Sequence, residues 1–380
     1  MAYTNGNSND TFHTPLTRYY VDVRPHAPIS AKMHLSPPKR LEEDLPLLHT
    51  LPLELQESIK KYVRKPDRFM SLASALLKYL FIHRTAKIPW SEVKVSRTPK
   101  PHGRPYWSPP QGWVSRKDGS GQRFEGLEFN VSHQAGVVVL VGCGTPTRPR
   151  DARVDEVTMV DVRSLAVINP DPTVVGEFES EIDEDAPEDV RIGVDVACTH
   201  EPPRTPDLST HEKLVEWVEV FGEMFSQREQ HDMINVPIPG GQGGHPGGLS
   251  VAESKARRFY TYWALKEAYI KMVGEGLLAG WLRDLEFRDV VVPRRPDMQD
   301  GKEQWTIISE EEVQKLGVLF KGKNITKSMT TTLEAFEDTF LVTTMTRGVV
   351  DTTRREERWQ NIDLFGDIEL CATGKCRCLG

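Results

Sequence analysis

The chain has 380 residues and a formal net charge of −7 at neutral pH. This length is enough for two domains that each bury a core. A net negative charge argues against general nucleic-acid binding, and no stretch approaches the roughly 18 consecutive apolar residues of a membrane span. The start of the chain also lacks the basic and apolar regions of a signal peptide. We therefore expect a cytoplasmic, monomeric protein that binds neither nucleic acid nor a membrane.

The five cysteines are an odd number, which fits a reducing compartment better than a disulfide framework. Three of them, Cys371, Cys376 and Cys378, lie within the last ten residues. Their spacing is not the paired CxxC spacing of a zinc site. We therefore interpret residues 351–380 as a solvated tail and expect its removal after Trp359 to leave activity within a few-fold.

The N-terminal lobe is expected over residues 1–145. A strand-like run at 16–25 is followed by a helical pattern at 51–84, where Pro66 separates two helices and the second faces a core. The continuous β-branched run GVVVLVG at 136–142 predicts a buried strand.

Residues 146–189 are interpreted as a linker. Their last part, 177–189, holds eight acids and no base, which is typical of a surface insertion. The glycine-dense run at 237–248 lacks the flanking strand and the Lys-Ser/Thr ending of a phosphate-binding loop, so we expect a loop without that role. We expect residues 177–189 to be replaceable by a short Gly/Ser linker with activity kept within a few-fold.

The C-terminal lobe is expected over residues 190–350. A strand at 190–198 precedes an amphipathic helix at 211–230 and a second helix at 263–277. Three further strands are expected at 285–293, 305–308 and 340–348. Helix-then-strands occurs on both sides of the linker, which suggests two similar α+β halves.

The helix WALKEAYIKMVGEGL is apolar but carries three central charges. At about 100° per residue, Lys266 falls near the centre of the apolar face, whereas Glu267 and Lys271 share a flanking stripe. Taken alone, the last two favour an exposed ion pair worth a few tenths of a kcal/mol. Taken alone, Asp195 in IGVDVA favours a strand residue satisfied by backbone donors, and the polar residues of FNVSHQAG favour a turn.

Together, in this order, the segments FNVSHQAG, IGVDVA and WALKEAYIKMVGEGL resemble the 4′-phosphopantetheinyl transferases of the larger, two-lobed type. That family has an N-[VI]-S-H turn, a G-[IV]-D strand and a W-x-x-K-E-[AS]-x-x-K helix. The resemblance covers residues 50–143 and 190–346, and it is greatest to the broad-specificity fungal enzymes. It implies an α+β fold made of a pseudo-two-fold pair of similar lobes, with the active site in the cleft between them.

The resemblance implies a holo-[acyl-carrier-protein] synthase. Such an enzyme transfers 4′-phosphopantetheine from coenzyme A to a serine of a carrier domain and releases 3′,5′-ADP. The carriers serve fatty acid, polyketide and nonribosomal peptide synthesis, or aminoadipate reductase in lysine biosynthesis. Two alternatives remain open: another user of coenzyme A such as an acyltransferase, and a catalytically silent carrier-binding or scaffold protein.

The resemblance also implies roles for single residues. Asp195 and Glu267 would hold Mg²⁺, with Mn²⁺ as a substitute, because Mg²⁺ prefers carboxylates together with phosphate oxygens. Glu267 would also deprotonate the serine, and Lys271 would stabilise the leaving group. The residues expected to contact coenzyme A, the 3′-phosphate included, are Lys65, Arg97, Asn130, Ser132, His133, Lys266 and Lys271. For Lys266 a second interpretation is that its stem covers the core.

The chain departs from many family members at one position. They have a second acid two residues after the aspartate, and here that position is Ala197. We therefore expect the metal to have only two protein carboxylates, with water in place of the missing one.

Overall fold

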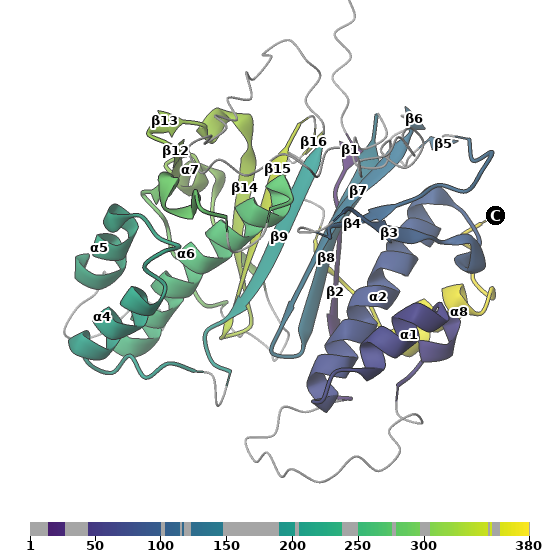
Figure 1. Cartoon of the computed structure of the whole chain (residues 1–380), viewed down its shortest axis with the longest axis horizontal. Helices are drawn as coiled ribbons and strands as arrows, with labels where there is room; N and C mark the ends of the chain where they lie inside the picture. The colour runs from purple at the N-terminus through teal and green to yellow at the C-terminus, as the bar shows by residue number, and fades with distance from the viewer. Residues whose placement is uncertain are drawn as a thin grey trace, which may run out of the picture.

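The structure, a computed structural model, has two lobes that lie side by side (Figure 1). It describes residues 14–26, 45–99, 103–114, 116–117, 123–146, 190–201, 205–237, 250–275, 279–296, 305–348, 350–351 and 358–379. Each lobe contains a four-stranded sheet and one long helix, which confirms the predicted two-lobed α+β fold. Among the described helices, none is both long and apolar enough to span a bilayer.

The N-terminal lobe has the strand order β17-β2-β8-β7. Its strands are β2 (Thr17–Asp22), β7 (Gly126–Gln134), β8 (Val137–Thr145) and β17 (Gln360–Asn361). The two predicted helices are confirmed as α1 (Leu53–Lys60) and α2 (Lys65–Ala86). Pro66 lies in the first turn of α2, where its missing N–H costs nothing.

The C-terminal lobe has the strand order β11-β14-β15-β9. Its strands are β9 (Arg191–Cys198), β11 (Trp305–Ile307), β14 (Thr330–Phe336) and β15 (Phe340–Arg347). The long helix is α6 (Val251–Val273), which extends the predicted helix towards its N-terminus. A capping box of Ser250 and Glu253 starts α6, and Gly274 ends it with a φ of 81°.

The two lobes repeat one topology. Each has a strand, then a long helix, then a hairpin whose last strand pairs antiparallel with the first strand. In the N-terminal lobe these are β2, α2 and the β7–β8 hairpin, with β2 beside β8. In the C-terminal lobe they are β9, α6 and the β14–β15 hairpin, with β9 beside β15. The prediction of two similar halves is thus confirmed at the level of strand order.

Smaller elements surround these cores. They are β1 (Thr14–Pro15), β3 (Val95–Arg97), β4 (Pro105–Trp107), β5 (Arg116–Lys117), β6 (Arg123–Phe124), β10 (Leu285–Arg288), β12 (Gly317–Phe320), β13 (Lys323–Asn324), β16 (Val350–Asp351), α4 (His211–Val220), α5 (Gln227–Asn235), α7 (Glu310–Val313) and α8 (Glu369–Ala372). Short 3₁₀ turns include η3 (Trp90–Glu92) and η5 (Leu282–Asp284), and η7 (Leu364–Ile368) is a π-helical turn.

The prediction of a single amphipathic helix at 211–230 is wrong. The chain forms α4 and α5 there, with a break between them. The break has a local cause, because Ser226 accepts a hydrogen bond from the Glu229 N–H while the Glu229 carboxylate accepts one from the Ser226 N–H. This reciprocal cap starts a new helix.

The lobes share an apolar layer. Alternate residues of β8 (Val137, Val139 and Val141) and of β9 (Ile192, Val194 and Val196) are buried in one cluster, together with aromatic residues of β14 and β15. The other face of β8 packs on α2. Because strand side chains alternate between faces, each sheet is covered by its own helix on one side and by the partner lobe on the other.

The segment at 358–379 is not a solvated tail, so that interpretation is wrong. Its strand β17 pairs with β2, and the Ile362 N–H donates to the Tyr20 carbonyl at 2.8 Å. Four of its side chains are buried in the core of the N-terminal lobe: Ile362, Leu364, Ile368 and Cys371. Figure 1 shows this segment in yellow, and its η7 and α8 pack on α2. The terminal segment is therefore part of the lobe, and ending the chain after Trp359 would remove core residues.

This packing predicts a pair of contrasting stability effects. Ile368→Ala should lower the free energy of unfolding by about 2–5 kcal/mol, because it leaves a cavity at a fully buried position. Leu370→Ala, two residues away and 47% exposed, should change it by less than about 0.5 kcal/mol. Urea unfolding measures both values. Equal, small losses would mean that the segment does not pack on the lobe.

Some expectations fall on residues outside the described part of the chain. They concern the acidic segment at 177–189, the glycine-rich run from 238 to 248, and the Gly276–Leu277 end of the helix motif. The dispensability of residues 177–189 stays a prediction.

Candidate active site

Three predicted residues meet where the two lobes face each other. The Lys271 ammonium, on α6, donates to Asp195 Oδ1 at 2.6 Å and to Ser132 Oγ at 2.9 Å. The Ser132 hydroxyl, on β7, donates to the same Asp195 oxygen at 2.8 Å. The Asp195 side chain is 7% exposed and that of Lys271 is 26% exposed, so the cluster is buried on one side and open at the ammonium.

Gly193 explains how α6 comes so close to Asp195. Gly193 and Asp195 lie on the same face of β9, since they are two residues apart. A Cβ atom at position 193 would lie 1.9 Å from the Ala268 carbonyl oxygen and 2.6 Å from the Met272 nitrogen. Only glycine therefore lets the backbone of α6 pack against β9 at this point, at the residues that directly follow Glu267 and Lys271.

Glu267 completes the cluster. It is 8% exposed and precedes Lys271 by four residues on α6. Desolvation by burial, followed by the negative charge of Asp195, raises the pKa of the Glu267 carboxyl to about 7, and the Lys271 ammonium opposes this rise. Two buried carboxylates that repel each other, with one ammonium beside them, are a set of hard oxygen donors that fits a divalent cation.

The predicted N-[VI]-S-H turn is part of a strand. Residues 126–134 form β7, and the turn follows at Ala135 and Gly136, which have φ values of 48° and 84°. The alternation of polar residues along β7 could have revealed this, because it is the period of a strand with one polar face.

That polar face joins the lobes. Side-chain oxygens on β7 accept hydrogen bonds from backbone N–H groups of β9 at every second residue: Glu128 from Ile192 at 3.2 Å, Asn130 from Val194 at 3.3 Å, Ser132 from Val196 at 3.3 Å, and Gln134 from Cys198 at 3.1 Å. Ser132 is held in register by this ladder. The Asn130 side chain is also held by this ladder. Its contact with coenzyme A stays a prediction.

His133 lies on the opposite face of β7, towards α2. Its imidazole reaches solvent, yet protein surrounds it closely enough that desolvation, followed by the charges of Lys271 and Lys78, lowers its pKa. Lys78 of α2 is half-buried, and burial, followed by the neighbouring Arg97, lowers its pKa to about 8. Lys78 and Arg97 thus form a cationic pair, with the His133 imidazole beside them, near the carboxylates.

Lys78 was missed by the sequence analysis. The signal was present, because Lys78 is the only charged residue in the apolar run SLASALLKYLFI of α2. A lone cation inside a core-facing helix is costly unless something pairs with it. Lys65, the lysine expected instead, lies 13 residues earlier, about 20 Å along the helix axis. Its ammonium lies 5.4 Å from the Phe69 ring centre, so its contact with coenzyme A stays a prediction.

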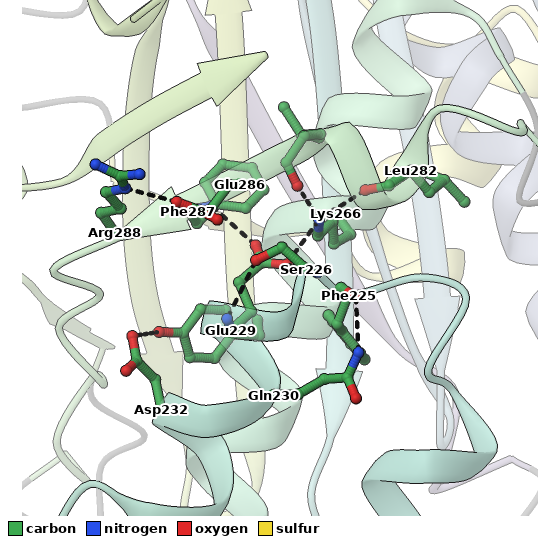
Figure 2. A network of polar contacts seen from close by, with 12 residues as sticks. Phe225, Ser226, Glu229, Gln230, Asp232, Lys266, Leu282, Glu286, Phe287 and Arg288 are labelled. Atoms are coloured by element: carbon green, nitrogen blue, oxygen red, sulfur yellow. Dashed lines mark hydrogen bonds and ion pairs between the residues drawn. The ribbon is translucent and has the colours of Figure 1, made fainter. Parts of the chain in front are cut away.

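Lys266 is the one expected coenzyme A contact that the structure contradicts. Its side chain is fully buried and points towards Glu229 and Leu282 inside the C-terminal lobe (Figure 2). The ammonium lies 2.9 Å from Glu229 Oε2, and it donates to the carbonyl of Leu282 at 2.9 Å and to that of Leu285. A group enclosed in this way cannot reach a bound nucleotide.

The Lys266–Glu229 pair ties three elements together. The Glu229 carboxylate of α5 also accepts hydrogen bonds from the N–H groups of Ser226 at 2.7 Å and of Phe287, on β10, at 2.8 Å (Figure 2). Desolvation by burial raises the pKa of Glu229 and lowers that of Lys266, and each partner opposes the shift of the other. Lys266 therefore holds α6, α5 and β10 in place beneath the site.

Comparison with known proteins agrees with this arrangement in both halves of the chain. The family model described as 4′-phosphopantetheinyl transferase, N-terminal, matches residues 40–145. The model of the 4′-phosphopantetheinyl transferase superfamily matches residues 191–314. These ranges fall in both lobes, and the second contains Asp195, Glu267 and Lys271.

The curated relatives match almost the whole chain. It is 36% identical to 4′-phosphopantetheinyl transferase A of Aspergillus fumigatus and 34% identical to 4′-phosphopantetheinyl transferase NpgA of Emericella nidulans, in each case over 96% of both chains. It is 30% identical to a 4′-phosphopantetheinyl transferase of Aureobasidium melanogenum, over 80% of this chain and 85% of the relative. With the family motifs carried on β7, β9 and α6, these matches show that the chain is an enzyme that belongs to the 4′-phosphopantetheinyl transferases.

Proposed function

We propose that this enzyme transfers 4′-phosphopantetheine from coenzyme A to a serine hydroxyl of carrier domains and releases 3′,5′-ADP. The observation that carries the proposal is the group of Asp195, Glu267 and Lys271 between the lobes, where two carboxylates and one ammonium converge. Phosphoryl transfer depends mostly on positioning and on neutralising phosphate charge, and this group offers both.

In this proposal the serine oxygen bonds to the phosphorus that carries pantetheine. The bond from that phosphorus to the oxygen shared with the adenosine half breaks, and the electron pair leaves on 3′,5′-ADP. The Glu267 carboxylate accepts the serine proton. The Lys271 ammonium donates to the leaving oxygen. A Mg²⁺ ion bound to Asp195 and Glu267, for which Mn²⁺ would substitute, would neutralise the diphosphate charge.

We assign the 3′-phosphate of coenzyme A to Arg97, Lys78 and His133. The support is electrostatic. Burial and then the neighbouring Arg97 lower the pKa of Lys78, and burial followed by the charges of Lys271 and Lys78 lowers the pKa of His133, so a bound dianion would relieve this repulsion. Arg97 is exposed, and its guanidinium donates a hydrogen bond to the Gly103 carbonyl at 2.9 Å. This bond holds the guanidinium in place at the protein surface.

Arg97→Ala should weaken coenzyme A binding by about 1.5–3 kcal/mol, the scale of a hydrogen bond to a charged group. Lys78→Met should have an effect of the same size. Neither change should matter for 3′-dephospho-coenzyme A, because that compound lacks the group they bind. Lys61→Ala removes an exposed lysine elsewhere in the lobe and serves as the charge control. Calorimetric titration of both compounds measures the effect, and equal losses on the two would exclude the assignment.

Ala197 bears on how the metal binds. It is fully buried on the same face of β9 as Asp195. Two carboxylates alone make a weak Mg²⁺ site, so Mg²⁺ and coenzyme A should bind with strong mutual dependence. Titration of Mg²⁺ with and without coenzyme A tests this, and equal affinities would refute the two-carboxylate site. Ala197→Glu should raise the Mg²⁺ affinity of the free enzyme, and an unchanged affinity would mean that position 197 does not face the metal.

One mass spectrum tests the function as a whole. An apo acyl carrier protein incubated with the enzyme, coenzyme A and Mg²⁺ should gain the mass of phosphopantetheine. An acyl adduct would support an acyltransferase, and an unchanged carrier would support a silent binding protein. Parallel reactions with carriers of fatty acid, polyketide, peptide and aminoadipate pathways would rank the substrates. Since one chain supplies both sides of the site, we propose that the enzyme works as a monomer in the cytoplasm.

A further inference from the structure

Four potential metal ligands converge far from Asp195. The Nε2 or Nδ1 of His83 and the Sγ atoms of Cys371, Cys376 and Cys378 all lie within 4.8 Å of one another. His83 belongs to the last turn of α2, whereas the three cysteines lie on α8 and in the residues after it. Within the described residues this is the only cluster of at least three such groups that could hold an ion.

The separations match a tetrahedral zinc ion. Zinc–sulfur bonds of about 2.3 Å at tetrahedral angles place two sulfur ligands about 3.8 Å apart. The Sγ atoms of Cys371 and Cys378 are 3.7 Å apart. A zinc–nitrogen bond of about 2.0 Å places nitrogen and sulfur ligands about 3.5 Å apart. The Nε2 atom of His83 lies 3.2 Å from Cys376 Sγ. A disulfide between Cys371 and Cys378 would need their sulfurs about 2 Å apart, so these thiols are not bonded.

The orientation of His83 is that of a metal ligand. The residue is 1% exposed, and its Nδ1 lies 2.7 Å from the backbone carbonyl oxygen of Ile88. That carbonyl can only accept, so Nδ1 carries the proton and Nε2 presents its lone pair to the cysteines. A histidine that binds zinc has this arrangement, because a carbonyl on the far nitrogen sets the tautomer and the ring orientation.

The surroundings also balance the charge. Three thiolates, one neutral imidazole and Zn²⁺ leave one net negative charge on the site. The Arg84 guanidinium, next to His83 in the chain, lies beside the Cys371 thiol and is placed to offset that charge. Cys371 is buried, and Cys376 and Cys378 are half-buried, so the set is enclosed but open to an entering ion.

We propose that His83, Cys371, Cys376 and Cys378 bind one zinc ion in a closed, structural site that fastens the terminal segment to α2. Four protein ligands fill a tetrahedral zinc ion and leave no position for substrate, which is the mark of a structural site. The search for CxxC pairs missed the site, because the spacing here is CxxxxCxC and the fourth ligand is almost 300 residues away.

The site would help to hold the two lobes together. Before β17, Trp359 stacks on Trp305 of the C-terminal lobe at 4.9 Å and donates to Glu334 at 3.0 Å. After β17, the chain packs on the N-terminal lobe and ends at the cysteines. The ion would thus fix the end of a segment that contacts both lobes. It would also stiffen the link from α2 through η3 to β3, the strand that carries Arg97.

The test uses the full chain, prepared under reducing conditions with zinc present, and measures metal rather than transfer activity. Elemental analysis should find about one zinc ion per chain. Exchange with Co²⁺ should produce the visible d–d bands of a tetrahedral site and a thiolate-to-cobalt charge-transfer band. Removal of the metal by a chelator should lower the melting temperature, and Zn²⁺ but not Mg²⁺ should restore it.

Variants separate this site from adventitious binding. Cys376→Ser and Cys378→Ala, at half-buried positions, should each abolish the cobalt spectrum and sharply reduce zinc content. Cys143→Ala changes a buried cysteine of β8 outside the cluster and should keep both. The proposal is overturned if the reduced wild-type chain holds no zinc and gives no cobalt spectrum, if it contains a Cys371–Cys378 disulfide, or if Cys143→Ala loses as much zinc as Cys376→Ser.

Discussion

Asp195→Asn and Glu267→Gln should each reduce turnover by about 10²–10⁴-fold, the scale of a lost acid–base or charge-stabilising group. Each substitution keeps the shape of the side chain and removes one of the two carboxylates to which we assign the metal and the diphosphate. The melting temperature should stay close to that of the wild type. In Asp195→Asn the amide oxygen can still accept from Ser132 and Lys271. In Glu267→Gln the buried, repelled carboxylate is replaced by a neutral group.

The measurement is the initial rate of carrier modification, followed by mass spectrometry, alongside thermal unfolding of each variant. Glu223→Gln removes an acid whose side chain is 89% exposed and should leave the rate unchanged. Near-normal transfer by Asp195→Asn or by Glu267→Gln would refute the assignment of the site. A large fall in melting temperature would assign a structural role to the residue instead.

Lys266→Met should lower the free energy of unfolding by about 3–5 kcal/mol, the usual cost of leaving one partner of a buried ion pair alone. The Lys266 and Glu229 side chains are both 0% exposed, so water cannot replace the lost ammonium. Urea unfolding, followed by fluorescence of the eight tryptophans, gives the value.

Two controls sharpen this result. The double variant Lys266→Met with Glu229→Gln should regain part of the loss, because the unpaired charge is gone and the Gln oxygen can still accept from the Phe287 N–H. Lys315→Met breaks an exposed pair with Glu311, whose side chains are 62% and 86% exposed, and should cost less than about 0.5 kcal/mol. If Lys266→Met costs no more than Lys315→Met, the buried network does not hold the lobe together.

The sequence by itself determined the parts whose signals are local. Pro66 marked the start of α2, and the β-branched run marked β8. Helix periodicity placed Glu267 and Lys271 on one stripe, and the resemblance of their motif to the family marked them as site residues. The two-lobed fold could be predicted because a helix followed by strands occurs twice along the chain.

Only the tertiary structure decided which partner each buried polar group meets. Periodicity placed Lys266 on the apolar face of α6, but it could not reveal Glu229 of α5 as the partner that removes Lys266 from the nucleotide. Lys78 joined Arg97 and His133 only once α2, β3 and β7 were packed together. The three terminal cysteines looked solvated in the sequence, and the fold brings them to His83, 293 residues before Cys376. The physical reason is common to all three cases: charge and ligand pairing depends on contacts between residues distant in the chain, whereas helix and strand periods depend on neighbours.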